Sequence, residues 1–197
     1  MIDIFIQLII LFVVIFDPLA SLAVFFSATS SMKKKDRQKT ATYAVLVAGL
    51  LSLMVIVLGE TLLELFSTNI EEFRIAGGII LGILGIKMAL GGSLSNNKEK
   101  LKGDSARAIA AIIGTPLLTG PAAITAILVA INDYGRFLTG MSVLIVLTFT
   151  VILFYQSERI HKFIGKTTIQ TVSTILGLIT IAWGVKFITI GIKAIFS

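Results

Sequence analysis

FIQLIILFVVIFDPLASLAVFFSATS, from Phe5 to Ser30, is the stretch that decides the fold class of this chain. Its 26 residues carry one charge, the carboxylate of Asp17, in a nearly continuous run of apolar side chains. About 20 consecutive apolar residues carry a helix across the roughly 30 Å hydrocarbon layer of a bilayer. The stretch therefore predicts a transmembrane helix. It also predicts a break at Pro18, because proline lacks an amide donor and clashes with the preceding turn.

Five further apolar stretches follow along the chain. The 197 residues are 56% hydrophobic and only 14% charged, which is more apolar than an ordinary water-soluble domain. The expected helices span residues 5–30, 40–65, 73–92, 106–131, 137–155 and 168–192. The sequence thus predicts an all-α polytopic membrane protein of six transmembrane helices.

An internal repeat divides the chain into two halves of three helices. Pro18 matches Pro116 at an offset of 98 residues, and Lys87 matches Lys186 at an offset of 99. Because three crossings are an odd number, the second copy must enter the membrane inverted, which is the architecture of many secondary transporters. We expect a first repeat over residues 1–92, a cytoplasmic linker over 93–105 and a second, inverted repeat over 106–197.

Basic residues are concentrated in alternate loops. Of the 17 Lys and Arg residues, twelve fall in the first, third and fifth loops, three fall in the loops and end of the other side, and two lie inside helices. Positively charged loops stay in the cytoplasm. We therefore expect a multi-pass protein of the cell (inner, cytoplasmic) membrane with both termini outside, and no nucleic-acid partner.

The two proline breaks fall near the middle of the bilayer at equivalent positions of the repeats. In the fourth helix, Gly114-Thr115-Pro116 is followed by Thr119-Gly120-Pro121. Irregular backbone at that depth must be buried in protein or line a wet cavity. A proline kink healed by nearby hydroxyls is the plainer alternative. Two matching breaks, one of them with an acid, favour a binding site.

Such a site suits a small zwitterion. The half-helices that begin after Pro18 and Pro121 present N-terminal amides to a carboxylate, while hydroxyls, unwound carbonyls and Asp17 receive an ammonium group or a cation. Asp17 lies deep in a span, where it is expected to bind sodium, bind the substrate ammonium or carry a proton. The candidate substrate-binding residues are Asp17, Pro18, Ser21, Gly114, Thr115, Thr119 and Gly120.

Other charged and small residues have plainer interpretations. Lys87 and Lys186 lie near helix ends, so we expect their ammonium groups to extend to the membrane interface. Gly77, Gly78 and Gly177 are expected to allow close helix packing. With no cysteine and a single histidine, the chain predicts no metal site.

Three motifs carry a resemblance to a known family. They are Asp17-Pro18-Leu19, Phe73-Arg74-Ile75-Ala76-Gly77-Gly78 and Pro116-Leu117-Leu118-Thr119-Gly120-Pro121-Ala122-Ala123-Ile124. In this order in a six-helix chain they resemble the MarC family, also called the small neutral amino acid transporter (SnatA) family, over essentially the whole sequence. The resemblance implies transport of glycine, alanine and similar amino acids, coupled to a cation gradient, with substrate held at the two breaks. It also implies a role for Arg74, which would pair with an acid or gate the cavity at the outer end of the third helix.

The sequence therefore predicts a secondary transporter that alternates access to a midplane amino acid site. Its coupling ion would be sodium or a proton, and no other cofactor is expected. An exporter of amino acids or of another small metabolite is the alternative within transport, and a channel or scaffold is the alternative outside it. An enzyme is not expected, because hydrolysis needs a nucleophile with its base or a metal set.

Overall fold

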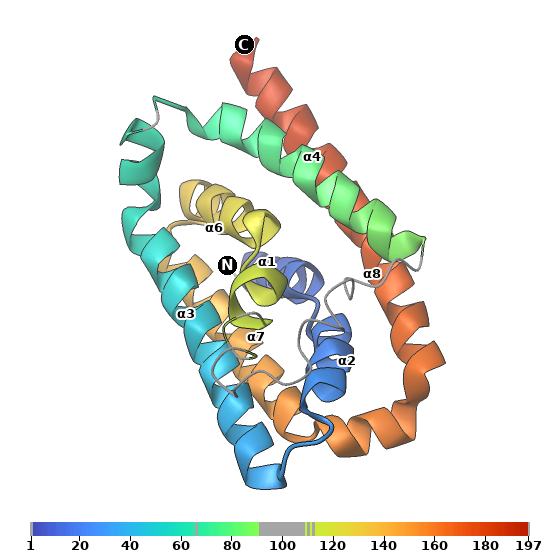
Figure 1. Ribbon diagram of the computed structural model, residues 1–197. Helices are drawn as coiled ribbons and strands as arrows, with labels where there is room; N and C mark the ends of the chain where they lie inside the picture. Colours follow the sequence, from blue (N-terminus) through green and yellow to red (C-terminus); the bar gives the residue numbers. More distant parts are fainter. Residues whose placement is uncertain (1, 66, 91–108, 110, 112, 197) are drawn as a thin grey trace.

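The computed structural model describes residues 2–65, 67–90, 109, 111 and 113–196, and regular structure in this part of the chain is helical (Figure 1). The expected linker at 93–105 lies outside the described residues. The elements are α1 (Ile2–Phe16), α2 (Pro18–Thr29), α3 (Lys34–Leu65), α4 (Ile70–Ala89), the π-helical segment η1 (Ile113–Leu118), α6 (Pro121–Tyr134), α7 (Arg136–Tyr155) and α8 (Ser157–Ile195).

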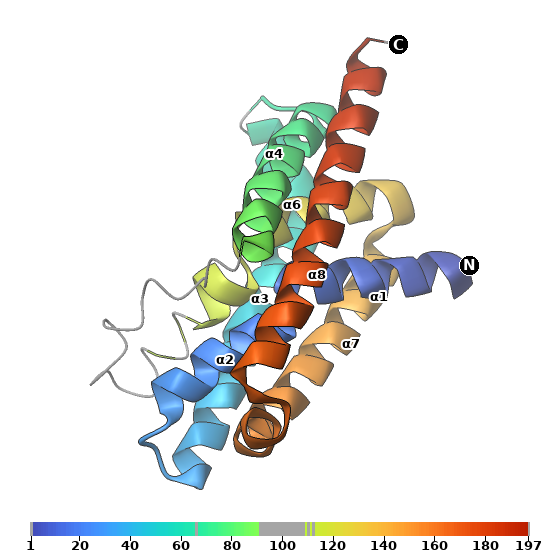
Figure 2. The same cartoon turned by 90° about the vertical axis from the view of Figure 1, so that its right-hand side faces the viewer.

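The first expected span is divided into α1 and α2 at Asp17. This residue has a left-handed backbone, with φ 38° and ψ 68°, a conformation in which aspartate is enriched among residues other than glycine. Its carboxylate accepts a hydrogen bond from the Ala20 N–H at 3.2 Å, and Pro18 fills the first position of α2. The Ser21 hydroxyl donates to the Phe16 carbonyl at 3.2 Å. The two half-helices consequently run in different directions, as Figure 2 shows.

The fourth expected span is divided between η1 and α6. The Thr119 hydroxyl donates to the Gly114 carbonyl at 3.0 Å, and α6 starts after Gly120 with Pro121 in its first turn. Proline is favourable there because the first amides of a helix have no partner within the helix. The chain thus interrupts the helix where the sequence places its second group of prolines.

Both broken helices lie in the interior. Two-thirds of the apolar part of the first span is buried, against 28–39% in the spans formed by α3, α7 and α8. Every residue of α6 from Thr125 to Ile131 is buried. Figure 1 shows α1 and α6 enclosed between α3 on one side and α4 and α8 on the other. Asp17 at the first break and Thr119 at the second are both buried in protein, as irregular backbone inside a bilayer would require.

Glycines bring α4 and α8 into direct backbone contact. A Cβ placed on Gly78 would lie 2.6 Å from the Gly184 carbonyl oxygen, and one on Gly85 would lie 2.6 Å from that of Gly177. The helices pair in antiparallel fashion, since ascending positions in α4 meet descending positions in α8. Gly77 faces the other way, where a Cβ would collide with the side chain of Thr125 in α6. Small residues of this kind let membrane helices approach closely.

Among the described residues, four helical segments are long and apolar enough to cross a membrane. They are Ile2–Thr29, Lys34–Gly59, Arg136–Tyr155 and Thr167–Ile195. α6 is a shorter apolar helix. α4 has 20 residues but carries charged residues at both ends, so hydropathy alone does not mark it as a span. The described part of the chain is thus helical, with several helices that are long and apolar enough to span a membrane.

Parts of two expected loops are helical, so α3 and α8 begin earlier than the sequence predicts, although the apolar span Thr167–Ile195 agrees with the expected helix at 168–192. α3 begins at Lys34 rather than Thr40, and α8 begins at Ser157 rather than Thr168. Lys, Arg and Gln are good helix formers, so a run of charges ends the apolar segment without ending the helix. Figure 1 shows the start of α8 crossing the foot of the bundle before the helix turns upward.

Candidate functional site

A cavity of about 210 Å³ lies between the two helix breaks, and we call it the central cavity. Asp17 lines it from the first break, Gly120 and Pro121 line it from the second, and α4 lines it through residues between Ile80 and Met88. Most of the remaining wall is aliphatic. Pockets for drug-sized ligands occupy roughly 300–1,000 Å³, so the central cavity suits a ligand of few heavy atoms.

The Asp17 carboxylate has spare acceptor capacity. The residue is only 3% exposed. One of its oxygens accepts from the Ala20 N–H at 3.2 Å, and the other accepts from the Ser173 hydroxyl of α8 at 3.1 Å. A carboxylate offers about four lone-pair sites, so two hydrogen bonds orient the group and leave positions for an ammonium group or a monovalent cation.

The start of α6 presents a positive dipole end to the same cavity. Gly120 is the N-cap residue, with an extended backbone and no side-chain hydrogen bond to cap the helix. Ala122 and Ala123 of the first turn also line the cavity. Uncapped N-terminal turns bind anions through their amides and the helix dipole. This wall of the cavity therefore favours a carboxylate.

Lys87 brings a cation to the central cavity from the last turn of α4. The extension of this side chain to the membrane interface stays a prediction, because Lys87 is exposed and also belongs to the lining residues. Within the described part of the chain, Lys87 forms no ion pair with Asp17 within 4 Å. The cavity thus holds opposite charges that do not neutralise each other directly.

The other predicted substrate-binding residues lie outside the cavity wall. The hydroxyls of Ser21 and Thr119 each donate to a backbone carbonyl next to a break. Gly114 packs against α3, where an added Cβ would lie 2.6 Å from the Ala44 carbonyl oxygen. Thr115 is exposed, and Pro18 is buried at the start of α2. These residues lie at or next to the breaks, where the two hydroxyls bind backbone carbonyls. Asp17 and Gly120 line the cavity.

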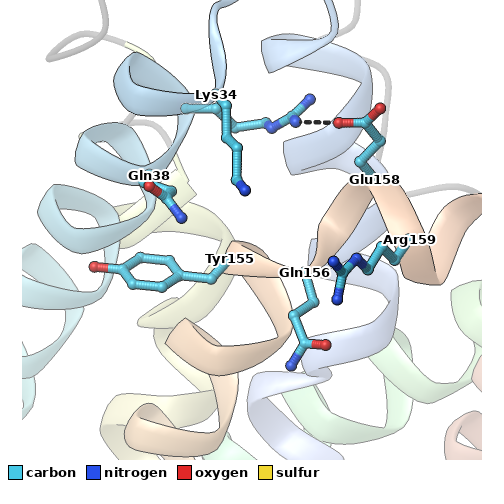
Figure 3. Close-up of a pocket in the computed structure, with 7 residues that line it drawn as sticks. Lys34, Gln38, Tyr155, Gln156, Glu158 and Arg159 are labelled. Carbon is cyan, nitrogen blue, oxygen red and sulfur yellow. Dashed lines mark hydrogen bonds and ion pairs between the residues drawn. The ribbon is translucent and has the colours of Figure 1, made fainter.

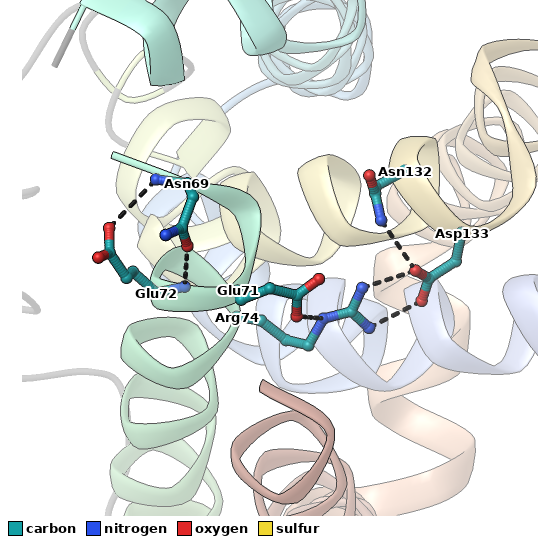
Figure 4. Close-up of polar contacts among 6 residues, drawn as sticks. All are labelled: Asn69, Glu71, Glu72, Arg74, Asn132 and Asp133. Atoms are coloured by element: carbon teal, nitrogen blue, oxygen red, sulfur yellow. Dashed lines mark hydrogen bonds and ion pairs between the residues drawn. The ribbon is translucent and has the colours of Figure 1, made fainter. Parts of the chain in front are cut away.

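Arg74, the predicted gate, belongs to a polar cluster at the start of α4 (Figure 4). Its guanidinium donates to both carboxylate oxygens of Asp133, at 2.9 and 2.6 Å, and its Nε lies 3.3 Å from a carboxylate oxygen of Glu71. Asn132 donates to the same Asp133 carboxylate at 3.2 Å. Arg74 is 3% exposed, and its bidentate pair joins α4 to the end of α6 away from the central cavity.

The first turn of α4 is fixed next to this cluster by a capping box. Asn69 accepts a hydrogen bond from the Glu72 N–H at 2.8 Å, and the Glu72 carboxylate accepts one from the Asn69 N–H at 3.1 Å. Reciprocal bonds of this type satisfy orphan amides at a helix start. The capping box therefore holds the helix end that carries Arg74.

Sequence reasoning missed Lys87, Ser173 and Asp133 as partners. Lys87 and Lys186 occupy equivalent positions of the repeat. The repeat singles out both residues, but it does not indicate which of them faces a cavity. Ser173 and Asp133 contact residues 156 and 59 positions away, and no local pattern carries that information. In the described residues, no three His, Cys, Asp or Glu side chains gather as they would around a metal ion.

Comparisons with known proteins match this chain to integral membrane proteins. Residues 2–196 match the family model described as MarC family integral membrane protein. The UPF0056 membrane protein YhcE of Escherichia coli (strain K12) is 33% identical over 189 residues, covering 91% of this chain and 87% of that protein. The UPF0056 membrane protein MJ1677 of Methanocaldococcus jannaschii is 32% identical over 186 residues, with 91% of each chain covered. No solved structure matches the sequence.

Proposed function

This chain belongs to the MarC family of integral membrane proteins, and we propose that it is a secondary transporter of small neutral amino acids that works by alternating access. The observation that carries the proposal is the central cavity between the two helix breaks. Secondary transporters bind substrate near the bilayer midplane, at discontinuous helices whose N-terminal ends face anionic groups.

The charges of the central cavity match the two ends of an amino acid. Asp17 offers a carboxylate to the substrate ammonium, while Lys87 and the start of α6 offer positive charge to the substrate carboxylate. The aliphatic wall and the volume of about 210 Å³ favour a small side chain. A substrate such as glycine or alanine satisfies both charges and leaves no polar group against the wall.

We propose that the two halves of the chain are inverted repeats around this cavity, giving six spans. The glycine contacts support this arrangement. An offset of 99 relates Gly78 to Gly177 and Gly85 to Gly184, while the contacts join Gly78 to Gly184 and Gly85 to Gly177. Such reciprocal pairing is what a two-fold relation between equivalent surfaces produces. The packing of α2 on α8 and of α6 on α4 fits the same relation.

Coupling to a cation is proposed to pass through Asp17. The carboxylate is buried and has acceptor positions left over, and an ionisable group at this depth is costly enough to mark a functional position. A sodium ion or a proton would bind at the carboxylate on the side of high cation concentration and cross together with the substrate, and the carrier would return without either. No other cofactor is proposed.

Transport by the purified protein in liposomes tests the proposal. We expect saturable uptake of labelled glycine and alanine above empty vesicles under an inward sodium or proton gradient. Counterflow from vesicles loaded with unlabelled alanine should also occur, and it is independent of the direction in which the protein works in the cell. Conductance without saturation would indicate a channel, and absence of uptake and counterflow for every neutral amino acid would overturn the proposal.

A further inference from the structure

A second pocket, of about 450 Å³, lies at the end of the molecule where α3 begins, and we call it the basic pocket. Lys34, Arg37 and Gln38 line it from the first turns of α3, and Gln156 and Arg159 line it from the junction of α7 and α8. Figure 3 shows the two sets of side chains facing each other across it. The basic pocket shares no lining residue with the central cavity.

Positive charge in the basic pocket exceeds negative charge. Three cations line it against one carboxylate, that of Glu158. Glu158 accepts from Arg37 at 2.5 Å, and Arg37 is only 8% exposed. Among the described residues, Lys34 and Arg159 have no carboxylate within ion-pair distance. The pocket therefore presents two cations that nothing in its wall neutralises.

The start of α3 adds to this positive potential. α3 begins at Lys34, so the positive end of its helix dipole lies at the basic pocket, while the start of α8 at Ser157 is offset by the end of α7 at Tyr155. The side-chain amides of Gln38 and Gln156 supply further donors. Charged donors with amide donors beside them form the environment in which phosphate oxygens are bound.

We propose that the basic pocket binds the phosphate group of an anionic ligand, and that an anionic phospholipid is its source. Basic pockets between transmembrane helices bind anionic headgroups at the membrane surface. A volume of about 450 Å³ exceeds the need of a single free phosphate ion and leaves room for a headgroup. The cations come from α3 and α8, so a bound phosphate links elements from the two halves of the chain.

The test compares two double variants of the full chain that remove the same amount of charge. Lys34→Gln with Arg159→Gln removes the two unneutralised cations of the pocket. Lys35→Gln with Lys39→Gln removes two exposed cations of α3 that do not line it. Native mass spectrometry in detergent would count the retained phosphatidylglycerol, with phosphatidylcholine of the same acyl chains as the neutral lipid. Thermal shift with inorganic phosphate would measure free anion binding.

We expect selective retention of phosphatidylglycerol by the wild type, weakened by about tenfold or more in the pocket variant and unchanged in the control variant. Inorganic phosphate could also stabilise the wild type in the thermal shift assay. If only the pocket variant loses this stabilisation, the result would support a phosphate site whose ligand is soluble. An equal loss of phosphatidylglycerol in both double variants would show that only the overall surface charge matters, and it would overturn the proposal. No loss in the pocket variant, or no binding of either anion by the wild type, would overturn it as well.

Discussion

At the scale of the residue, Asp17 combines a carboxylate with a left-handed backbone conformation. Its left-handed φ of 38° sets the angle between α1 and α2, and its carboxylate lines the central cavity. The two roles can be separated, because asparagine also tolerates the left-handed region and caps helices about as well as aspartate.

Asp17→Asn should therefore keep the fold and weaken transport. The amide oxygen can still accept from the Ala20 N–H, whereas the charge that would hold an ammonium group or a cation is gone. A hydrogen bond to a charged group is worth about 1.5–3 kcal/mol, so we expect at least about tenfold weaker amino acid uptake and loss of the ion dependence. Asp17→Ala should also lower the melting temperature, because removal of a cap costs about 1 kcal/mol. Wild-type ion dependence in the Asn variant would contradict the role of the charge.

Lys87 and Lys186 form a matched pair for a second experiment. Lys87 lines the central cavity, while the Lys186 ammonium lies 4.5 Å from the centre of the Trp183 ring, and Lys186 does not line that cavity. We expect Lys87→Gln to raise the KM for alanine by about tenfold through loss of a charged contact, and Lys186→Gln to leave it unchanged. Alanine methyl ester lacks the carboxylate that Lys87 would bind. Compared with the wild type, Lys87→Gln should therefore lose affinity for alanine but not for the ester, as competition assays would show. Equal effects of both substitutions would argue against a cavity role.

The residue scale also shows how far the sequence predicts the site. Asp17 and Gly120 were predicted because proline next to an acid or a glycine is a local signal, and both reach the cavity. The depth of Lys87 along α4 could be read from the chain, but not the direction of its side chain toward a break on another helix. Ser173 was missed for the same reason, since its contact with Asp17 depends on how α8 packs.

At the scale of the element, the antiparallel contact of α4 with α8 depends on the absence of side chains at a few positions. Gly82 lies on the same helix as Gly78 and Gly85, yet a Cβ added there would meet nothing within 4 Å. Close packing therefore requires glycine at Gly78 and Gly85, whereas at Gly82 the structure has room for a larger side chain.

Alanine substitutions at Gly82 and Gly85 should have opposite effects on stability. Gly82→Ala adds a methyl group in open space, so helix propensity should stabilise the protein by roughly 0.5–1 kcal/mol. Gly85→Ala places a Cβ 2.6 Å from the Gly177 carbonyl oxygen, and overpacking of this kind costs about 1–3 kcal/mol. Melting temperatures in detergent would measure both effects. A gain of stability from Gly85→Ala would contradict the close contact.

Helix breaks were easier to predict than helix ends. A proline acts within one turn of the chain, so both interruptions could be placed from the sequence. The starts of α3 and α8 were misplaced because the apolar part of each helix ends at the bilayer, while hydrogen bonding continues in water through Lys, Arg and Gln. Hydropathy indicates where lipid ends, and it does not indicate where a helix ends.

At the scale of the whole molecule, the orientation in the membrane rests on the uneven distribution of Lys and Arg. The absence of cysteine from the chain makes this testable, because each introduced cysteine is the only reactive thiol. Ser31 is exposed in the loop that follows α2, and Asn132 is exposed near the end of α6.

Ser31→Cys should react with a membrane-impermeant maleimide in inverted vesicles but not in intact cells, because we expect the basic side to face the cytoplasm. Asn132→Cys should react in intact cells. Labelling of the two variants from the same side would contradict the proposed six-span topology. Labelling with the sides exchanged would keep the topology and reverse the orientation.

The joint at Asp17 has a mechanical consequence. A single residue carries both the hinge between two half-helices and the group that would bind the transported ion or the substrate ammonium. A ligand bound to the carboxylate would therefore act directly on the residue whose φ and ψ angles set the direction of α2. The same residue would then bind the ligand and set the direction of α2. Coupling between binding and helix reorientation would not need a chain of contacts through distant side chains.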